Sequence, residues 1–112
     1  METINERGRE ALRKVRGMVR TPSRDTDPRH TLYSYPAKFQ AAVPSYLIEK
    51  FSPPDGLVLD PFGGGGTTAA CAAALGRSFA HYDLNPFSCL LAQAKTASML
   101  PGPLEEAVAL IE

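Results

Sequence analysis

The stretch DPFGGGGTT, residues 60–68, decides the fold of this 112-residue chain. It follows the apolar run Leu57-Val58-Leu59, which is typical of a buried parallel strand. It precedes the small-residue run 69–75, which favours a helix ending at Gly76. Successive glycines leave backbone N–H groups open to a ligand and are costly to order. A plain turn needs fewer glycines, so we predict a strand, a ligand-cradling turn and a helix.

A second strand and a second helix follow this stretch. The segment Ser78–Asp83 has the composition of a strand, and Asn85-Pro86 is a typical start for a helix, which we expect to continue to about Met99. Strands joined by a helix form a parallel sheet with a right-handed crossover. A sheet of only two strands buries too little apolar surface to be stable alone. We therefore expect an α/β fold whose sheet of two parallel strands with flanking helices is incomplete on its own.

The chain before the first strand divides into distinct parts. Residues 1–20 carry apolar residues at helical spacing among arginines, which predicts an amphipathic basic helix. The polar, proline-bounded stretch 21–29 is a predicted linker. Aromatic residues cluster within 30–39, and a helix with Pro44 in its first turn follows. We expect residues 30–112 to form one partial ligand-binding domain.

Charge is balanced overall but unevenly distributed. Twelve Lys and Arg residues balance twelve Asp and Glu residues, whereas residues 1–30 carry eight basic side chains against five acidic ones. A basic helix could contact nucleic acid. A charged helix that merely faces solvent explains the same pattern equally well, so both interpretations stay open.

Cysteine usage and hydropathy indicate a cytoplasmic protein. Cys71 and Cys89 form no C-x-x-C pair, so we expect free thiols and no metal site. The first residues lack the apolar stretch of a signal peptide, and no apolar run is long enough to cross a membrane. We therefore expect neither membrane nor metal among the partners.

Both predicted strands end in a carboxylate. Asp60 and Asp83 are 23 residues apart, which matches one strand–helix–strand step and places both acids at one edge of the sheet. A ligand of such a fold lies beyond that edge, where Asp83 could accept hydrogen bonds from a ribose diol. Leu84 and Pro86 could form an apolar wall for adenine. The alternative role for Asp83 is to cap the following helix.

These residues suit any cofactor that carries adenosine. The spacing Gly64-x-Gly66-x-x-Ala69 also fits the dinucleotide fingerprint of nicotinamide-dependent oxidoreductases, although a single match has little specificity. Asp60-Pro61-Phe62 before the glycines and Thr67-Thr68 after them argue against that class. A Walker phosphate loop is excluded more firmly, because no Lys-Ser/Thr pair follows the glycines.

Three motifs occur in a fixed order over about residues 30–97. They are His30-x-x-Tyr33-x-Tyr35-Pro36-Ala37-Lys38-Phe39, Asp60-Pro61-Phe62-x-Gly64-x-Gly66-Thr67-Thr68 and Tyr82-Asp83-Leu84-Asn85-Pro86. The set resembles the aromatic, S-adenosylmethionine-binding and second motifs of DNA amino-methyltransferases, which modify adenine N6 or cytosine N4. Gly65 departs from the family pattern, which usually has Ser or Thr there, and Gly63 occupies a variable position.

The resemblance implies a partial Rossmann-like class I methyltransferase sheet and S-adenosylmethionine as cofactor. Asp60 and the backbone of Gly64 and Gly66 would hold the methionine moiety, and Asp83 the ribose. The alternative for the aromatic residues at 35 and 39 is ordinary core packing. The alternative for the lysine at 38 is a surface position without function. The cofactor-site residues implied are Tyr35, Lys38, Phe39, Asp60, Pro61, Phe62, Gly64, Gly66, Thr67, Thr68, Asp83, Leu84 and Pro86.

The motif with which this family holds the target amine is missing, so we assign no catalytic residue. That motif combines Asp, Asn or Ser with Pro-Pro and an aromatic residue at a later strand end. Ser52-Pro53-Pro54-Asp55 is similar, but it lacks the aromatic residue and precedes the first strand. We interpret it as a turn.

We therefore expect the cofactor-binding part of a site-specific DNA methyltransferase, as a fragment or split subunit that is inactive alone. A complementary catalytic subunit or C-terminal segment would complete it and bind double-stranded DNA. The alternatives are an RNA base methyltransferase fragment and a non-catalytic module that binds S-adenosylmethionine or a partner.

Overall fold

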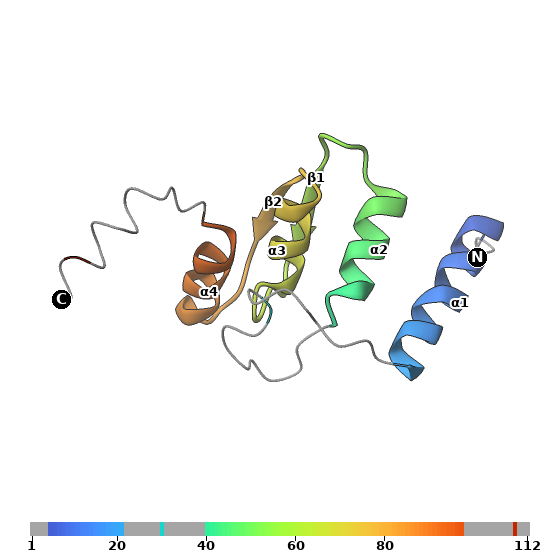
Figure 1. Ribbon diagram of the computed structural model, residues 1–112, viewed down its shortest axis with the longest axis horizontal. Coiled ribbons are helices and arrows are strands. Elements are labelled where there is room, and N and C mark those ends of the chain that lie inside the picture. The colour runs from blue at the N-terminus through green and yellow to red at the C-terminus, as the bar shows by residue number, and fades with distance from the viewer. Residues whose placement is uncertain (1–4, 22–29, 31–39, 98–108, 110–112) are drawn as a thin grey trace.

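The structure is a computed structural model that describes residues 5–21, 30, 40–97 and 109. Its strands pair in parallel, with Val58 opposite Phe79 and Asp60 opposite His81. The predicted α/β fold with a two-stranded parallel sheet and flanking helices is confirmed (Figure 1). The elements in chain order are α1 (Glu6–Arg20), α2 (Ala42–Phe51), β1 (Leu57–Asp60), α3 (Thr67–Ala74), β2 (Ser78–His81) and α4 (Pro86–Thr96).

Helix α3 lies directly on the sheet because its side chains are small. Ala70 and Ala72 are 1% and 0% exposed, and α3 contacts β1, β2, α2 and α4. The core cluster joins Ile48 of α2 to Cys71 and Ala72, and Val58 and Phe79 pack against it from the strands. Larger side chains on this face of α3 would force the helix away from the sheet.

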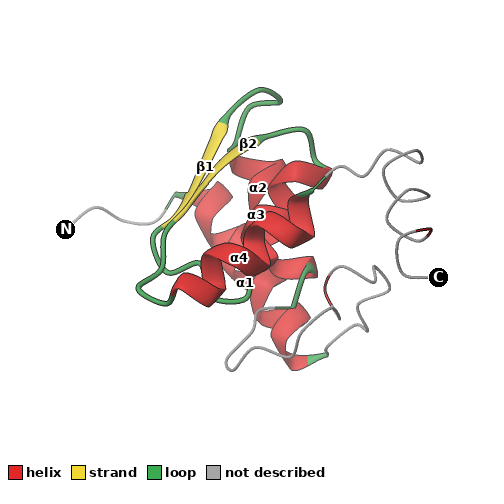
Figure 2. Cartoon of the chain, turned by 90° about the vertical axis from the view of Figure 1, so that its left-hand side faces the viewer, coloured by secondary structure: helices red, strands yellow, loops and turns green. Residues whose placement is uncertain are grey.

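The opposite face of the sheet is open within the described part of the chain. The helices gather on one side of the strands (Figure 2). Leu57 and Leu59 are 68% and 62% exposed, whereas Val58 between them is half-buried. The prediction that all of 57–59 is buried is therefore wrong for the two leucines, because only one face of β1 is covered. A groove of about 370 Å³ runs between α2 and the strand.

Polar side chains set the starts of α1 and α4. The Asn5 side chain accepts a hydrogen bond from the Gly8 N–H at 2.9 Å, and Asn85 accepts one from the Phe87 N–H at 3.0 Å. Pro86 occupies the first turn of α4, where a missing N–H costs nothing. Both helices lie close to their predicted places, and α4 is described to Thr96 rather than to Met99.

Two sequence predictions concern residues outside the described part: the linker 21–29 beyond its first residue and most of the aromatic segment 30–39. The division of the chain into domains stays a prediction. Within the described residues, no helix is long and apolar enough to cross a membrane.

Enlarging the sheet-facing side of α3 tests its close packing. We expect Ala72→Leu to lower the free energy of unfolding by about 1–3 kcal/mol, because the site has no room for added methyl groups. Ala74→Leu is the matched control on the exposed side of the same helix, and its effect should stay within about 0.5 kcal/mol. Urea unfolding measures both. Equal effects of the two substitutions would contradict close packing.

Candidate cofactor site

The glycine loop, residues 63–66, joins β1 to α3 and has a conformation that side chains would not allow. Gly64 and Gly66 have φ values of 52° and 81°, in the left-handed region that favours glycine. A Cβ on Gly66 would lie 3.0 Å from the Cα of Ala92 in α4. A Cβ on Gly63 would overlap the imidazole of His81. The loop therefore passes between β2 and α4 at a distance that only glycine permits.

Backbone pairing continues past the strands and ties the loop to β2. The Tyr82 N–H donates to the Asp60 carbonyl at 3.0 Å, and the Gly63 N–H donates to the Tyr82 carbonyl at 2.9 Å. Asp60 and Asp83 consequently lie at the same end of the sheet, as the sequence predicts. They line different hollows, however: Asp60 lines the groove beside α2, and Asp83 lines a hollow beside Phe62.

The carboxylate of Asp83 connects the glycine loop to the start of α4. Its Oδ1 accepts from the Asn85 N–H and its Oδ2 from the Gly64 N–H, both at 2.9 Å. These N–H groups, that of Asn85 most and then that of Gly64, lower the pKa of Asp83 below its ordinary 3.8, although burial opposes them. The group is thus ionised at neutral pH. Asn85, rather than Asp83, caps α4.

Helix α4 also binds the carbonyl groups of the loop. Ser88 Oγ, fully buried, donates to the Gly64 carbonyl at 2.5 Å. His81 Nε2 lies 2.8 Å from Ser88 Oγ. Because the serine proton is used on Gly64, His81 is the donor in that pair. Lys95, 1% exposed, donates from Nζ to the Gly65 carbonyl at 2.5 Å.

Sequence reasoning missed Ser88 and Lys95, although a signal for them exists. The buried positions of α4 are Ser88, Leu91, Ala92 and Lys95, which is the spacing of one helix face. Two polar residues on a face that is otherwise apolar need buried partners. The loop carbonyls are those partners. His81 belongs to the same network through its contact with Ser88.

The N–H groups that are open to a ligand differ from those expected. The Gly64 N–H binds Asp83, and the Gly66 N–H donates to the Gly63 carbonyl at 3.1 Å. Among the described residues, the N–H groups of Thr67, Thr68 and Ala69 have no acceptor. They form the first turn of α3, whose positive dipole end favours an anion.

An apolar hollow lies beside Asp83 at the end of the strands. Its volume is about 460 Å³, and Pro61, Phe62, Tyr82 and Leu84 line it together with Asp83. Phe62 and Leu84 are 86% and 103% exposed, which is unusual for large apolar side chains without a ligand or partner. Tyr82 is a lining residue that the sequence prediction omitted.

The remaining predicted site residues are placed as follows. Pro86 starts α4 and does not line this hollow, and Thr68 lines the groove beside α2. The Asp60 carboxylate accepts from the Phe62 N–H at 3.0 Å, which stabilises the turn into the loop. Tyr35, Lys38 and Phe39 lie outside the described residues.

A double-mutant cycle tests the contact between Gly63 and His81. Gly63→Ala should lower the free energy of unfolding by about 1–3 kcal/mol, because its methyl group overlaps the imidazole. In a His81→Ala background the same substitution should cost less than about 0.5 kcal/mol. Gly17→Ala, in open space on α1, is the control and should be neutral or stabilising. An equal cost of Gly63→Ala in both backgrounds would show that the imidazole is not its obstacle.

Removing one hydroxyl tests the support from α4. Ser88→Ala leaves the Gly64 carbonyl and His81 Nε2 without their shared partner, so we expect a loss of about 1–3 kcal/mol in unfolding free energy. Ser78→Ala, at an exposed position of β2, should change stability by less than about 0.5 kcal/mol. Chemical denaturation compares the two. A neutral Ser88→Ala would contradict the assigned hydrogen bonds.

Comparison with known proteins identifies a family and several relatives. A family described as DNA methylase matches residues 5–94. The chain is 30% identical over 66 residues to the type II methyltransferase M.MjaII of Methanocaldococcus jannaschii, and this match covers 59% of the chain and 12% of that protein. It is 48% identical over 44 residues to M.ScaI of Streptomyces caespitosus, with 39% and 14% covered. It is 36% identical over 53 residues to M.PvuII of Proteus hauseri, with 47% and 16% covered.

The matched region thus spans less than one fifth of the length of each of these relatives. No solved structure matches the chain with significant similarity. The family match includes the glycine loop and the ends of both strands, and it covers well over half of the chain. The chain belongs to this DNA methylase family.

Proposed function

We propose that the chain is the S-adenosylmethionine-binding part of a site-specific DNA methyltransferase that modifies an exocyclic base amine. The observation that carries the proposal is the ionised Asp83, bound to Gly64 of the glycine loop and bordering an apolar hollow. Family membership and the parallel pairing of β1 and β2 support a Rossmann-like class I methyltransferase sheet.

The residues present fit this cofactor. Asp83 uses one lone pair of each oxygen within the chain and keeps others for the two ribose hydroxyls. Phe62, Tyr82 and Leu84 supply apolar surface for adenine. The N–H groups of the first turn of α3 could donate to the carboxylate of the methionine moiety. Asp60 could pair with the ammonium of the same moiety. Pro61 shapes the turn after β1, and the expected parts of residues 35, 38 and 39 remain predictions.

The chain contributes binding and orientation to the reaction. When bound, S-adenosylmethionine supplies an electrophilic methyl group on its sulfonium. The chain's part is to fix the ribose and the methionine moiety, so that the cofactor presents one geometry to the incoming amine. No described residue is placed to hold that amine. We propose that the other portions of the enzyme, present in the much longer relatives, supply the amine-binding motif and the recognition of duplex DNA.

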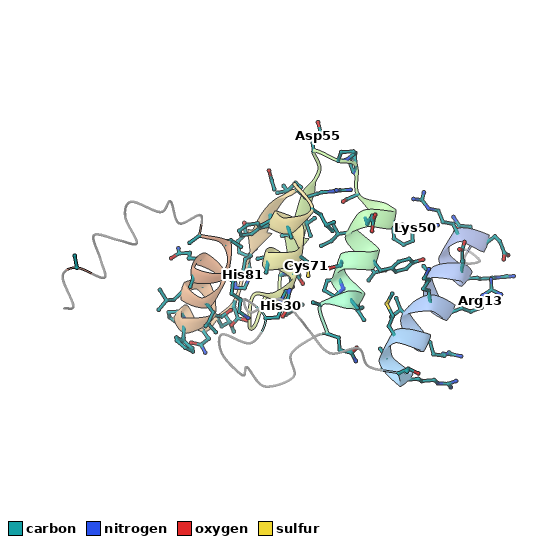
Figure 3. All side chains as sticks on the ribbon, viewed as in Figure 1. Arg13, His30, Lys50, Asp55, Cys71 and His81 are labelled. Carbon is teal, nitrogen blue, oxygen red and sulfur yellow. The ribbon has the colours of Figure 1, made fainter. Side chains whose placement is uncertain are left out.

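The segment Ser52-Pro53-Pro54-Asp55 does not fill that gap. Ser52 Oγ donates to the Ile48 carbonyl at 2.6 Å and accepts from Arg77 Nε at 3.2 Å, so its hydroxyl holds the turn together. The turn precedes β1 and lies at the opposite end of the sheet from His81 (Figure 3). Its contacts support a structural role.

Parallel titrations test the proposal against its main rival. Isothermal calorimetry with S-adenosylmethionine and with NAD should give binding of the first alone. We expect Asp83→Ala to weaken that binding at least about tenfold, because the ribose loses its charged acceptor. Asp55→Ala, in the exposed turn before β1, should leave it unchanged.

Binding of NAD in preference would identify a nicotinamide enzyme and overturn the proposal. Cofactor binding without methylation of DNA, when the chain is combined with the catalytic portion, would instead favour a non-catalytic module. Methylation of RNA in place of DNA by that combination would favour the RNA base methyltransferase.

A further inference from the structure

Four arginines form one exposed face of α1, which we call the arginine face: Arg9, Arg13, Arg16 and Arg20. At about 3.6 residues per turn these positions fall within an arc of about 60°. At about 1.5 Å per residue they extend over about 16 Å along the helix axis. All four side chains are exposed.

Contacts between α1 and α2 keep the arginine face turned away from α2. On the opposite side of α1, Arg7 lies over the ring of Phe51, with its guanidinium carbon 5.0 Å from the ring centroid, and donates to the Lys50 carbonyl. Lys14 Nζ lies 5.4 Å from the centroid of Tyr46. Ala11 is buried against α2 as well. Arg13 accordingly points away from α2 (Figure 3).

The positive charge of the arginine face is almost uncompensated. Arg13 lies 3.5 Å from Glu6, but both side chains are more than 70% exposed, at 72% and 80%, so solvent screens the pair. Within the described residues, Arg9, Arg16 and Arg20 have no carboxylate within 4.0 Å. Arginines three and four positions apart repel one another on a helix. An anionic partner along this face would remove that repulsion.

We propose that the arginine face binds the phosphate backbone of duplex DNA without regard to sequence. The choice of DNA among polyanions rests on the proposed function. A length of about 16 Å, laid along the duplex axis, spans the rise of roughly five phosphates of one strand, at about 3.4 Å of axis per phosphate. Guanidinium groups bind phosphate oxygens in pairs, which favours arginine over lysine for this contact.

The geometry argues against a membrane surface as the partner. A helix that lies on a bilayer inserts its apolar face between the lipids. Here the face that carries Ala11 packs on α2, and the exposed large apolar side chains of α1, Leu12 and Val19, lie beside four arginines. A rigid, linear polyanion fits such a surface better than a bilayer does.

Salt-dependent binding to a random-sequence DNA duplex tests the proposal. The 112-residue chain should bind with an affinity whose logarithm falls linearly with the logarithm of salt concentration, by about 0.9 per phosphate contact. Replacing the four arginines together by Gln should reduce that slope by about 3.6 and weaken binding at low salt at least about tenfold. The matched variant with four lysines keeps the charge and should keep most of the slope. Circular dichroism confirms that both variants retain α1.

The outcomes separate this inference from the proposed function. An unchanged slope in the Gln variant, preference for duplex RNA, or equal loss of affinity in the lysine variant would overturn the inference. The inference would also be overturned if the Gln variant lost binding to anionic vesicles but still bound DNA as the unaltered chain does. The Gln variant should bind S-adenosylmethionine as the unaltered chain does. If neither the Gln variant nor the unaltered chain binds the cofactor, the proposed function fails. The inference that the arginine face binds phosphate is then still supported, provided that DNA binding depends on the arginines.

Discussion

The structure depends on how the glycine loop is held between two neighbouring elements. Asp83, after β2, accepts from the loop's Gly64 N–H, while Ser88 and Lys95 of α4 donate to the carbonyls of Gly64 and Gly65. Donors and acceptors of one short loop are thus bound by residues that follow β2 and by α4. Burying a lysine at 1% exposure is costly unless its ammonium is hydrogen-bonded, so this support is part of the loop's fixed conformation.

This arrangement is the basis for proposing that the chain binds a cofactor and does not itself hold the target amine. The carbonyls of Gly64 and Gly65 are hydrogen-bonded to α4, and within the described residues the N–H groups at the start of α3 have no acceptor. The open face of the sheet, with Leu57 and Leu59 exposed, is unlike the fully covered parallel sheets of complete α/β domains. Both features are compatible with the proposed role, and the chain matches only a small share of each relative.

Local pattern predicted the fold well. The strand, glycine turn and small-residue helix follow from residues 57–76, and the parallel pairing follows from the connection through α3. The exposure of Leu57 and Leu59 could not be predicted, because burial of a strand depends on what covers its second face. The hydrogen bonds of Gly64 and Gly66 within the chain depend on φ values and on α4, which motif spacing does not specify. The buried role of Ser88 and Lys95 could have been predicted, since both residues interrupt the apolar face of α4.

The most direct measurement of the central claim is a ¹⁵N-labelled NMR titration of the chain with S-adenosylmethionine, which detects weak binding and locates it. We predict amide shifts in the glycine loop, in the first turn of α3 and at residues 82–84, with α1 and the turn before β1 unaffected. Shifts confined to other surfaces, or none at millimolar cofactor in a folded chain, would contradict the claim that this supported loop is a cofactor site.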